Sequence, residues 1–160
     1  MSDLEEFEAI KQVKYKYQRS VDTKNFEGLA EVLTEDAVAA YDSGKYLATG
    51  RKAIIEFLAS ALQRDDIATL HQVHCPELSL TSPTNATGIW YLHDYVINPG
   101  EDQGTLPGRS ILQGAGFYSD QYVKQDGQWM IQSTGYERTF EHYQPYVAGE
   151  GVSLRTRWMQ

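Results

Sequence analysis

The stretch that decides the fold class is RSILQGAGFYSDQYVKQDGQWMIQSTGYERTFE, residues 109–141. Two segments rich in aromatic and β-branched residues, 109–124 and 128–141, flank the dipeptide Asp126-Gly127. An Asp-Gly pair between alternating apolar residues is a strong β-hairpin signal, so we expect two long antiparallel strands here. Three upstream segments share this composition and are bounded by turn residues, and we expect them to be strands as well: 67–75, 78–81 and 86–97.

The first third of the chain has a helical pattern instead. Apolar residues from Leu4 to Val21 recur near helical spacing, and the segment Asp22–Asn25 interrupts the pattern with capping residues. A short second helix is expected from Phe26, ending at Thr34-Glu35-Asp36. The remaining elements expected in this third are two short strands at 37–42 and 46–48 and a third helix after Gly50.

Helices followed by long antiparallel strands predict an α+β fold. We expect N-terminal helices packed on one side of a strongly curved mixed or antiparallel sheet, which forms a cone with a ligand cavity at its open mouth. The expected organisation is a single domain over residues 1–145 and a tail over residues 146–160.

Composition narrows the possible partners. The chain has 160 residues and a net charge of -8, which disfavours nucleic acid and anionic lipid as partners. No apolar run is long enough to span a membrane, and the acidic start lacks the features of a signal peptide. The single cysteine, Cys75, cannot form an internal disulfide. We therefore expect a cytoplasmic protein.

Aromatic residues are unusually frequent, with 11 tyrosines, 3 tryptophans and 5 phenylalanines. Aromatic residues favour strands, so this surplus fits a β-rich protein. It also fits a pocket for a mainly apolar ligand that carries a few oxygen atoms, because tyrosine joins an apolar ring to a polar tip. Composition leaves both interpretations open.

Strand alternation selects two candidate catalytic residues. His71 shares a face with apolar residues of its strand, and Asp94 lies on the small and apolar face of the next one. Because a buried carboxylate needs a partner, we expect His71 and Asp94 to pair in one cavity, with the pair serving as a general base. The alternatives are a satisfied core pair, or one of the two side chains facing solvent.

Other motifs give weaker indications of a functional site. His71 and His74 lie on opposite faces of a strand, so a shared metal ion is not expected, and no nucleophile or phosphate-binding motif is present. We therefore predict neither a metal nor a cofactor. Tyr17 and Asp22 are five residues apart, about 140° around an ideal helix, and so would not share a face. Asp22 either turns inward or caps the second helix.

Four blocks of sequence resemble the SnoaL-like branch of the nuclear transport factor 2-like superfamily: KYKYQRSVDTKNFEGLAEVLTEDAVAAYD, TLHQVHCPELSL, ATGIWYLHDYV and GAGFYSDQYVKQDGQWMIQSTGYER. The resemblance covers residues 5–140. Within the superfamily, the residue pattern is most similar to bile-acid 7α-dehydratase-like and scytalone-dehydratase-like proteins. Five residues stand at positions matching that pattern: Tyr17, Asp22, Tyr41, His71 and Asp94.

The resemblance implies roles for these residues. His71 would abstract a proton, and Asp94 would orient His71 and stabilise its charge. Tyr17 and Tyr41 would donate hydrogen bonds to a developing oxyanion or a leaving oxygen. Asp22 would assist as an acid or base with a pKa raised by burial, which requires that it converge with Tyr17. The residues expected to bind substrate are Tyr41, Trp90, Phe117 and Arg138.

The expected function is therefore that of a cofactor-independent lyase (a dehydratase) or an isomerase or cyclase. Its substrate would be small, mainly apolar and polycyclic, of a steroid, terpenoid or polyketide kind. Two alternatives keep the fold without the chemistry: a small-ligand-binding module, and an accessory oligomeric subunit.

Self-association is expected on two grounds. The segments 109–124 and 128–141 carry more aromatic surface than one sheet face can hide, and a large apolar patch usually marks an interface. The resemblance also implies dimers or trimers built sheet to sheet.

Overall fold

The computed structural model describes residues 2–149 and 151–159. Three helices precede most of the sheet: α1 (Asp3–Asp22), α2 (Phe26–Ala30) and α3 (Arg51–Leu62). The strands are β1 (Leu33–Tyr41), β2 (Tyr46–Thr49), β3 (Ala68–Ser82), β4 (Asn85–Asn98), β5 (Ser110–Gln125) and β6 (Gln128–Pro145). The predicted α+β class is confirmed.

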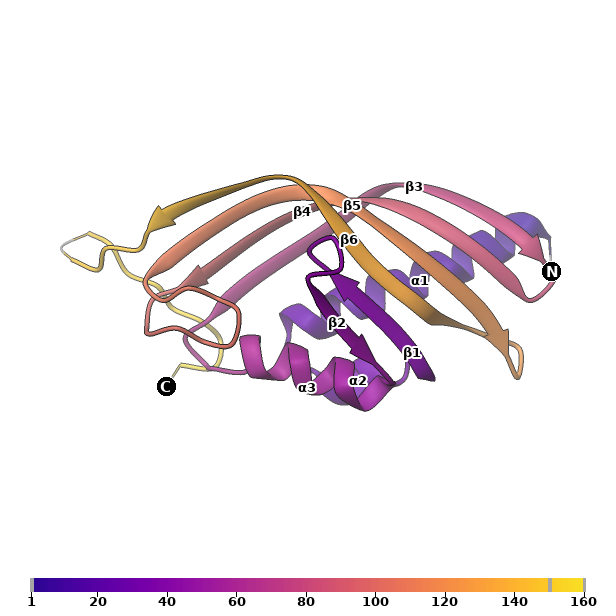
Figure 1. Cartoon of the computed structure of the whole chain (residues 1–160), viewed down its shortest axis with the longest axis horizontal. Coiled ribbons are helices and arrows are strands. Elements are labelled where there is room, and N and C mark those ends of the chain that lie inside the picture. Colours follow the sequence, from indigo (N-terminus) through magenta and orange to yellow (C-terminus); the bar gives the residue numbers. More distant parts are fainter. Residues whose placement is uncertain (1, 150, 160) are drawn as a thin grey trace.

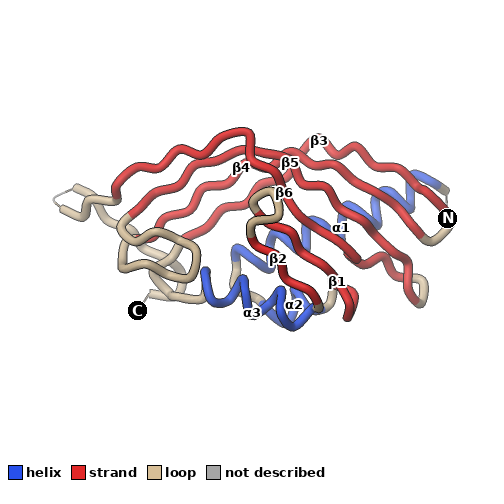
Figure 2. Tube along the Cα trace, viewed as in Figure 1, coloured by secondary structure: helices blue, strands red, loops and turns tan. Residues whose placement is uncertain are grey.

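The strands form one open sheet in the order β2-β1-β6-β5-β4-β3. Neighbouring strands are antiparallel except β1 and β6, which run parallel, so the sheet is mixed. The four long strands arch over the helices, and α1 runs along the underside of the arch (Figure 1). Figure 2 shows the same arrangement by element type, with the three helices gathered on the concave side. A ligand site on the concave face therefore lies between helices and sheet.

Local chemistry explains where α1 begins and ends. Ser2 and Glu5 form a capping box at its start, and the helix continues through Asp22 to a C-cap at Thr23. The N-cap of α2 is Asn25, whose side chain accepts a hydrogen bond from the backbone of Gly28. The idea that Asp22 caps the second helix is therefore wrong, and its carboxylate is available for another partner.

Three local features test the sequence-based elements. The Asp126-Gly127 turn joins β5 to β6 with both residues at positive φ, as a tight hairpin requires, and this prediction is confirmed. Residues 33–36 belong to β1 rather than ending a helix, because β1 pairs with β6 from Leu33 onward. The segments 67–75 and 78–81 belong to one strand, β3, whose register shifts between His74 and Glu77.

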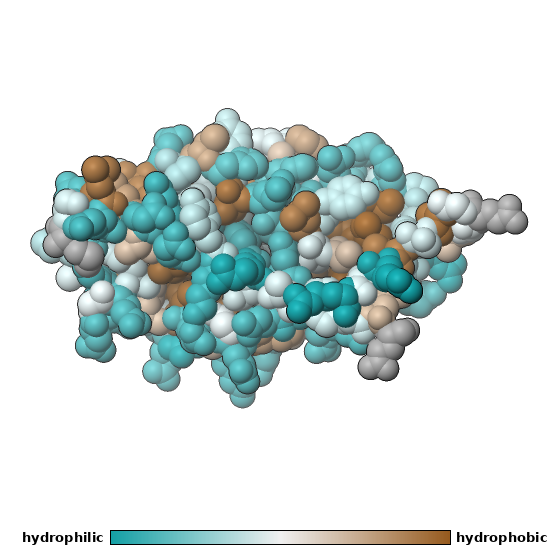
Figure 3. Space-filling view, turned by 180° about the vertical axis from the view of Figure 1, so that it is seen from behind, coloured by the Kyte–Doolittle hydropathy of each residue, from teal (hydrophilic) through white to brown (hydrophobic). Residues whose placement is uncertain are grey.

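The surface agrees with the acidic composition. Seen from behind, hydrophilic residues dominate and hydrophobic ones form separated patches (Figure 3). Among the described residues, no helix is both long enough and apolar enough to cross a membrane.

Candidate active site

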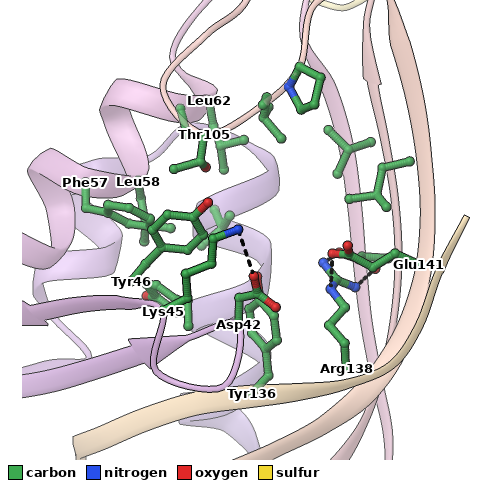
Figure 4. A pocket seen from close by; sticks show the side chains of 18 of the residues that line it. Asp42, Lys45, Tyr46, Phe57, Leu58, Leu62, Thr105, Tyr136, Arg138 and Glu141 are labelled. Carbon is green, nitrogen blue, oxygen red and sulfur yellow. Dashed lines mark hydrogen bonds and ion pairs between the residues drawn. The ribbon is translucent and has the colours of Figure 1, made fainter. Parts of the chain in front are cut away.

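A cavity of about 340 Å³ opens on the concave side, between α3, the end of α1, the β1–β2 turn and strands β4–β6. Its apolar wall is formed mainly by Val21, Phe57, Leu58, Leu62, Val96, Leu106 and Leu112. Asp42 and Lys45 stand on the β1–β2 side, with Tyr136, Arg138 and Glu141 of β6 facing them (Figure 4). The predicted cavity of the cone is therefore present, and its wall is mixed apolar and polar.

A pair of buried phenols forms one polar point of this cavity. The hydroxyl oxygens of Tyr17 on α1 and Tyr41 on β1 are 2.5 Å apart. Burial raises the pKa of both hydroxyls well above the ordinary value, so both keep their protons. One hydroxyl donates to the other, which leaves one proton free. The pair can therefore offer a single hydrogen bond to a ligand oxygen.

The second polar point is an arginine held between two carboxylates. Arg138 donates from Nη1 and Nη2 to the two oxygens of Asp94, at 2.6 and 2.7 Å, and its Nε lies 3.0 Å from Glu141 Oε1. Burial opposes the charge on Arg138, but the bonds to Asp94 outweigh it and raise the pKa of the guanidinium. Arg138 thus remains a fixed cation in the wall.

A missing side chain makes this contact possible. Gly114 of β5 lies between Asp94 and β6, and a Cβ placed on it would collide with Arg138 Nη1 and with Asp94 Oδ1. The guanidinium therefore crosses β5 over a bare backbone. The sheet is also irregular here, because the register with β6 shifts between Ala115 and Gly116.

His71 has a different partner from the expected one. Its Nδ1 lies 2.6 Å from Asp22 Oδ1 at the end of α1, and its backbone N–H donates to Asp22 Oδ2 at 2.8 Å. Thr69 Oγ1 donates to the same carboxylate at 2.8 Å. Burial acts to raise the pKa of Asp22, but the bonds from His71 and Thr69 outweigh it and lower that pKa. The expectation of a raised pKa is wrong.

The prediction that His71 and Asp94 pair in one cavity is also wrong. The two residues are direct cross-strand partners on the same face of β3 and β4, as alternation predicted. However, His71 lines a separate groove of about 410 Å³ between α1 and β3, whereas Asp94 lines the cavity. Neither side chain points to bulk solvent, since their exposed fractions are 14% and 3%.

The position of α1 explains this division. Tyr17 and Val21, one turn apart, line the cavity, whereas Gln18 and Asp22 line the groove beside β3. The helix remains regular through Asp22, so Tyr17 and Asp22 point in different directions, as the spacing of five residues predicted. Tyr17 therefore does not converge with Asp22. Tyr17 pairs with Tyr41 instead.

Two of the four expected substrate-binding residues line the cavity, and two do not. Tyr41 and Arg138 line the cavity. Trp90 faces inward but is fully buried, with its indole N–H donating to the Tyr122 hydroxyl, so it belongs to the core. Phe117 packs on Tyr91 at 4.5 Å between ring centroids, on the opposite face of the sheet from Asp94. Its expected contact with a ligand in the cavity is wrong, because alternation places it on the convex side.

Sequence reasoning missed a buried ion pair beneath the cavity. Lys14 and Asp120 are 2.8 Å apart and both side chains are fully buried. Asp120 also accepts hydrogen bonds from Tyr122 at 2.6 Å and Thr134 at 2.7 Å. The Lys14 ammonium lies 3.5 Å from the ring centroid of Tyr118, a cavity residue, and burial lowers the pKa of the lysine. This network braces the floor of the cavity.

Other cavity residues were missed too. Tyr118, Tyr136 and Glu141 all line the cavity, and Glu141 forms an ion pair with Arg138. Burial raises the pKa of Tyr136 to about 12 although Arg138 acts to lower it. The alternation of β6 signals this placement, since Tyr136 and Arg138 are two residues apart on one strand. Among the described residues, no group of three or more His, Cys, Asp or Glu side chains could hold a metal ion.

The sequence profile of the SnoaL-like domain matches residues 2–135, most of the chain. The chain belongs to the SnoaL-like domain family. This family is part of the nuclear transport factor 2-like superfamily, so the resemblance to its SnoaL-like branch is confirmed, whereas the finer similarity to bile-acid dehydratases is not shown.

Solved structures with a similar fold include proteins whose names state a chemical activity. A hexachlorocyclohexane dehydrochlorinase (LinA, type 2) has a TM-score of 0.77 at 20% identity, covering 94% of this chain and 100% of that one. A LinA type 3 enzyme from Novosphingobium barchaimii has a TM-score of 0.73 at 16% identity, covering 96% and 99%. A candidate scytalone dehydratase from Novosphingobium aromaticivorans has a TM-score of 0.69 at 23% identity, covering 92% and 91%. At these identities the likeness shows the fold alone.

Proposed function

We propose that this SnoaL-like protein is a cofactor-independent lyase in which His71 removes a proton from carbon. The observation that carries the proposal is the Asp22–His71 pair, with 2.6 Å between Asp22 Oδ1 and His71 Nδ1. Since Nδ1 donates to the carboxylate, the other ring nitrogen, Nε2, is left as the basic atom.

Asp22 is held so that it can support this role. Three donors fix its oxygens: the His71 ring, the His71 backbone and the Thr69 hydroxyl. A carboxylate fixed in this way sets the tautomer of the imidazole and stabilises the imidazolium that forms when Nε2 takes a proton. Its lowered pKa keeps Asp22 ionised near neutral pH, which this role requires. Asp22 is therefore a positioning residue for the base.

The cavity is placed to hold the body of the substrate. His71 and Asp94 are paired directly across β3 and β4, so their Cα atoms are about 4.5–5.5 Å apart although their side chains line different hollows. We place the apolar part of the substrate against the cavity wall, with its reacting carbon at the boundary near His71. The Tyr17–Tyr41 pair and Arg138 then offer donors to an oxygen of the substrate.

The reaction is an elimination. His71 Nε2 takes a proton from the carbon next to the one bearing the leaving group, and the C–H electrons form the new C=C bond. The leaving group departs with the electrons of its own bond. If it is hydroxide, the imidazolium returns the proton and water is released. The named chemistry of the structural neighbours, a dehydratase and a dehydrochlorinase, supports elimination as the reaction class.

The test begins with binding and continues with turnover. A thermal-shift screen with steroids and polycyclic phenols finds ligands, and a cyclic β-hydroxy ketone and γ-hexachlorocyclohexane then serve as elimination probes. We expect loss of water or chloride, and exchange of the carbon-bound proton in deuterated water. His71→Gln should lower the rate by about 100-fold or more.

The matched control is His93→Gln, because His93 lies on β4 and lines neither the groove nor the cavity, and its rate should stay near that of the wild type. An unchanged rate in His71→Gln would mean that another group moves the proton. Binding without exchange or turnover would favour a ligand-binding module, and absence of any ligand would favour an accessory subunit.

A further inference from the structure

Gln18 of α1 is a buried polar side chain that the mechanism proposed above does not use. Only 4% of its surface is exposed. Among the described residues, neither the amide nitrogen nor the amide oxygen of Gln18 has a hydrogen-bond partner. Buried polar groups are nearly always paired, because an unpaired one gives up its bonds to water without replacing them. Gln18 therefore costs the fold stability unless a ligand pairs with it, which is a property of functional residues.

The position of Gln18 connects the two hollows of the site. Gln18 lines the groove that holds His71, whereas Tyr17 beside it on α1 and Tyr118 of β5 line the cavity. Burial raises the pKa of the Tyr118 hydroxyl, and the Gln18 amide acts to lower that pKa, so the two groups are close although they make no hydrogen bond of normal geometry. Gln18 thus lies between the groove and the cavity, where α1 runs under the sheet (Figure 1).

The charged neighbours of Gln18 on α1 are engaged elsewhere. Lys14, one turn before it, is paired with Asp120, and Asp22, one turn after it, is paired with His71. The Gln18 amide keeps two donor hydrogens and an acceptor oxygen that no described residue uses. A glutamine side chain can also turn into a neighbouring hollow without a movement of the backbone, as interface side chains often do on binding. The amide can therefore reach a ligand that occupies the site.

We propose that Gln18 binds the two oxygens of a β-hydroxy carbonyl substrate and so selects it over a halogenated one. This role rests on the proposed function, in which the substrate lies along the cavity wall with its reacting carbon near His71. A carboxamide presents a donor, Nε2–H, beside an acceptor, Oε1. A β-hydroxy carbonyl compound presents the complementary pair, a carbonyl oxygen that accepts and a hydroxyl that donates. A chlorinated compound supplies no such pair and leaves the amide buried and unpaired, which disfavours its binding.

The bond from Gln18 to the carbonyl oxygen becomes stronger as the reaction proceeds. His71 Nε2 takes the proton from the carbon between the carbonyl and the hydroxyl-bearing carbon, and the C–H electron pair moves onto the carbonyl oxygen. Gln18 Nε2–H stabilises the negative charge that develops there. The carbonyl then re-forms, the new C=C bond forms and the C–O bond breaks. The leaving oxygen takes the electrons of that bond and the proton of the imidazolium, and water is released.

The first measurement is the melting temperature without substrate. Gln18→Met replaces the amide with an unbranched apolar group of similar length, so the melting temperature should rise by about 3 °C or more. The matched control is Gln12→Met on the same helix, since the Gln12 amide is exposed, donates to Glu8 and lines neither hollow. Its melting temperature should not rise. An unchanged or lower melting temperature in Gln18→Met would mean that the amide is already satisfied, and would overturn the proposal.

The second measurement compares the cyclic β-hydroxy ketone with γ-hexachlorocyclohexane. The wild type should have the higher kcat/KM for the hydroxy ketone. Gln18→Met should lower that value by about 100-fold, the scale of one donor to a developing oxyanion, and should change the value for the chlorinated probe by less than about threefold. Gln12→Met should match the wild type with both probes. A preference for the chlorinated probe, or an equal change with both probes in Gln18→Met, would overturn the role of Gln18 and leave the lyase function standing.

Binding separates this inference from the proposed function. If neither probe turns over in the wild type, the lyase function fails, and the ligand-induced rise in melting temperature then decides the role of Gln18. The hydroxy ketone should stabilise the wild type and Gln12→Met but not Gln18→Met. Equal stabilisation of all three proteins, or none in the wild type, would show that Gln18 does not bind this class of ligand.

Discussion

Helix α1 makes two ion pairs that differ in burial, Lys14–Asp120 and Asp22–His71. The difference indicates which pair stabilises the fold and which can take part in a reaction. Lys14 and Asp120 are both fully buried, and the Asp120 oxygens are occupied by further donors. His71 and Asp22 keep exposed side-chain fractions of 14% and 18% and border a groove. We interpret the buried Lys14–Asp120 pair as bracing the fold, whereas the Asp22–His71 pair, which borders a groove, can act on a ligand.

Breaking the buried Lys14–Asp120 pair should have the largest effect, a loss of folding stability. Lys14→Met leaves Asp120 buried without its cation, which costs about 3–5 kcal/mol of unfolding free energy. The melting temperature should fall by about 10 °C, at roughly 2–4 °C per kcal/mol for a chain of this size. Calorimetry measures this shift, and Lys14→Met with Asp120→Asn should recover part of it. An unchanged melting temperature would show that Lys14 does not brace the cavity floor.

Breaking the Asp22–His71 pair should lower the elimination rate more than it lowers the stability of the fold. Asp22→Asn removes the acceptor that holds His71 Nδ1, and we expect the elimination rate to fall by about 100-fold, or about 2.7 kcal/mol of activation free energy. Asp94→Asn should cost less, because Asp94 binds Arg138 and not His71. Steady-state kinetics of the two isosteric variants decides between them. A larger loss in Asp94→Asn would restore the pairing expected from sequence.

Gly114→Ala sharpens the comparison at the cavity wall. The added methyl group occupies the path of Arg138, so the arginine must leave Asp94, a loss of about 1.5–3 kcal/mol for bonds between charged groups. We expect a lower melting temperature and weaker binding of cavity ligands. Gly149→Ala is the control, since nothing lies within 4 Å of the added group there. Equal stability of the two variants would contradict this role for Gly114.

The smallest expected effect is the change in folding stability when acid protonates Asp22 of the Asp22–His71 pair. The pKa of Asp22 is lower in the folded chain than its ordinary value near 3.9, so its ionised form stabilises the fold at neutral pH. That contribution is lost as the pH falls below about 4 and through the folded-state pKa. Urea unfolding at pH 5, 4 and 3 should therefore show a steeper loss in the wild type than in Asp22→Asn. The control Asp36→Asn, at an exposed carboxylate, should follow the wild type.

The sequence predicted what alternation and turn chemistry can encode. The Asp126-Gly127 hairpin and the inward placement of His71 and Asp94 follow from local patterns. Alternation gives the face of a side chain but not its partner, so it could not choose between Asp22 on the helix and Asp94 on the next strand. That choice depends on how α1 crosses the sheet, which is a matter of packing.

Long-range contacts escaped prediction for related reasons. Arg138 reaches Asp94 only because Gly114 leaves room, and a glycine in a strand also fits a simple bend. Lys14 lies among charged residues of an amphipathic helix, where a lysine normally faces solvent. Its partner Asp120 is on β5, so nothing near Lys14 in the sequence reveals the pair.

The parallel pairing of β1 with β6 has a consequence for how the chain folds. Leu33 pairs with Ile131, and Lys124 of β5 holds Glu6 of α1 across 118 residues. During synthesis the early hairpin of β1 and β2 has no strand to join until β6 has left the ribosome. Contacts this distant make folding slow, because the loop between them must be closed before any pairing rewards it. We therefore expect the nascent N-terminal part to expose apolar surface for most of translation and to depend on chaperones more than a helical bundle of equal size.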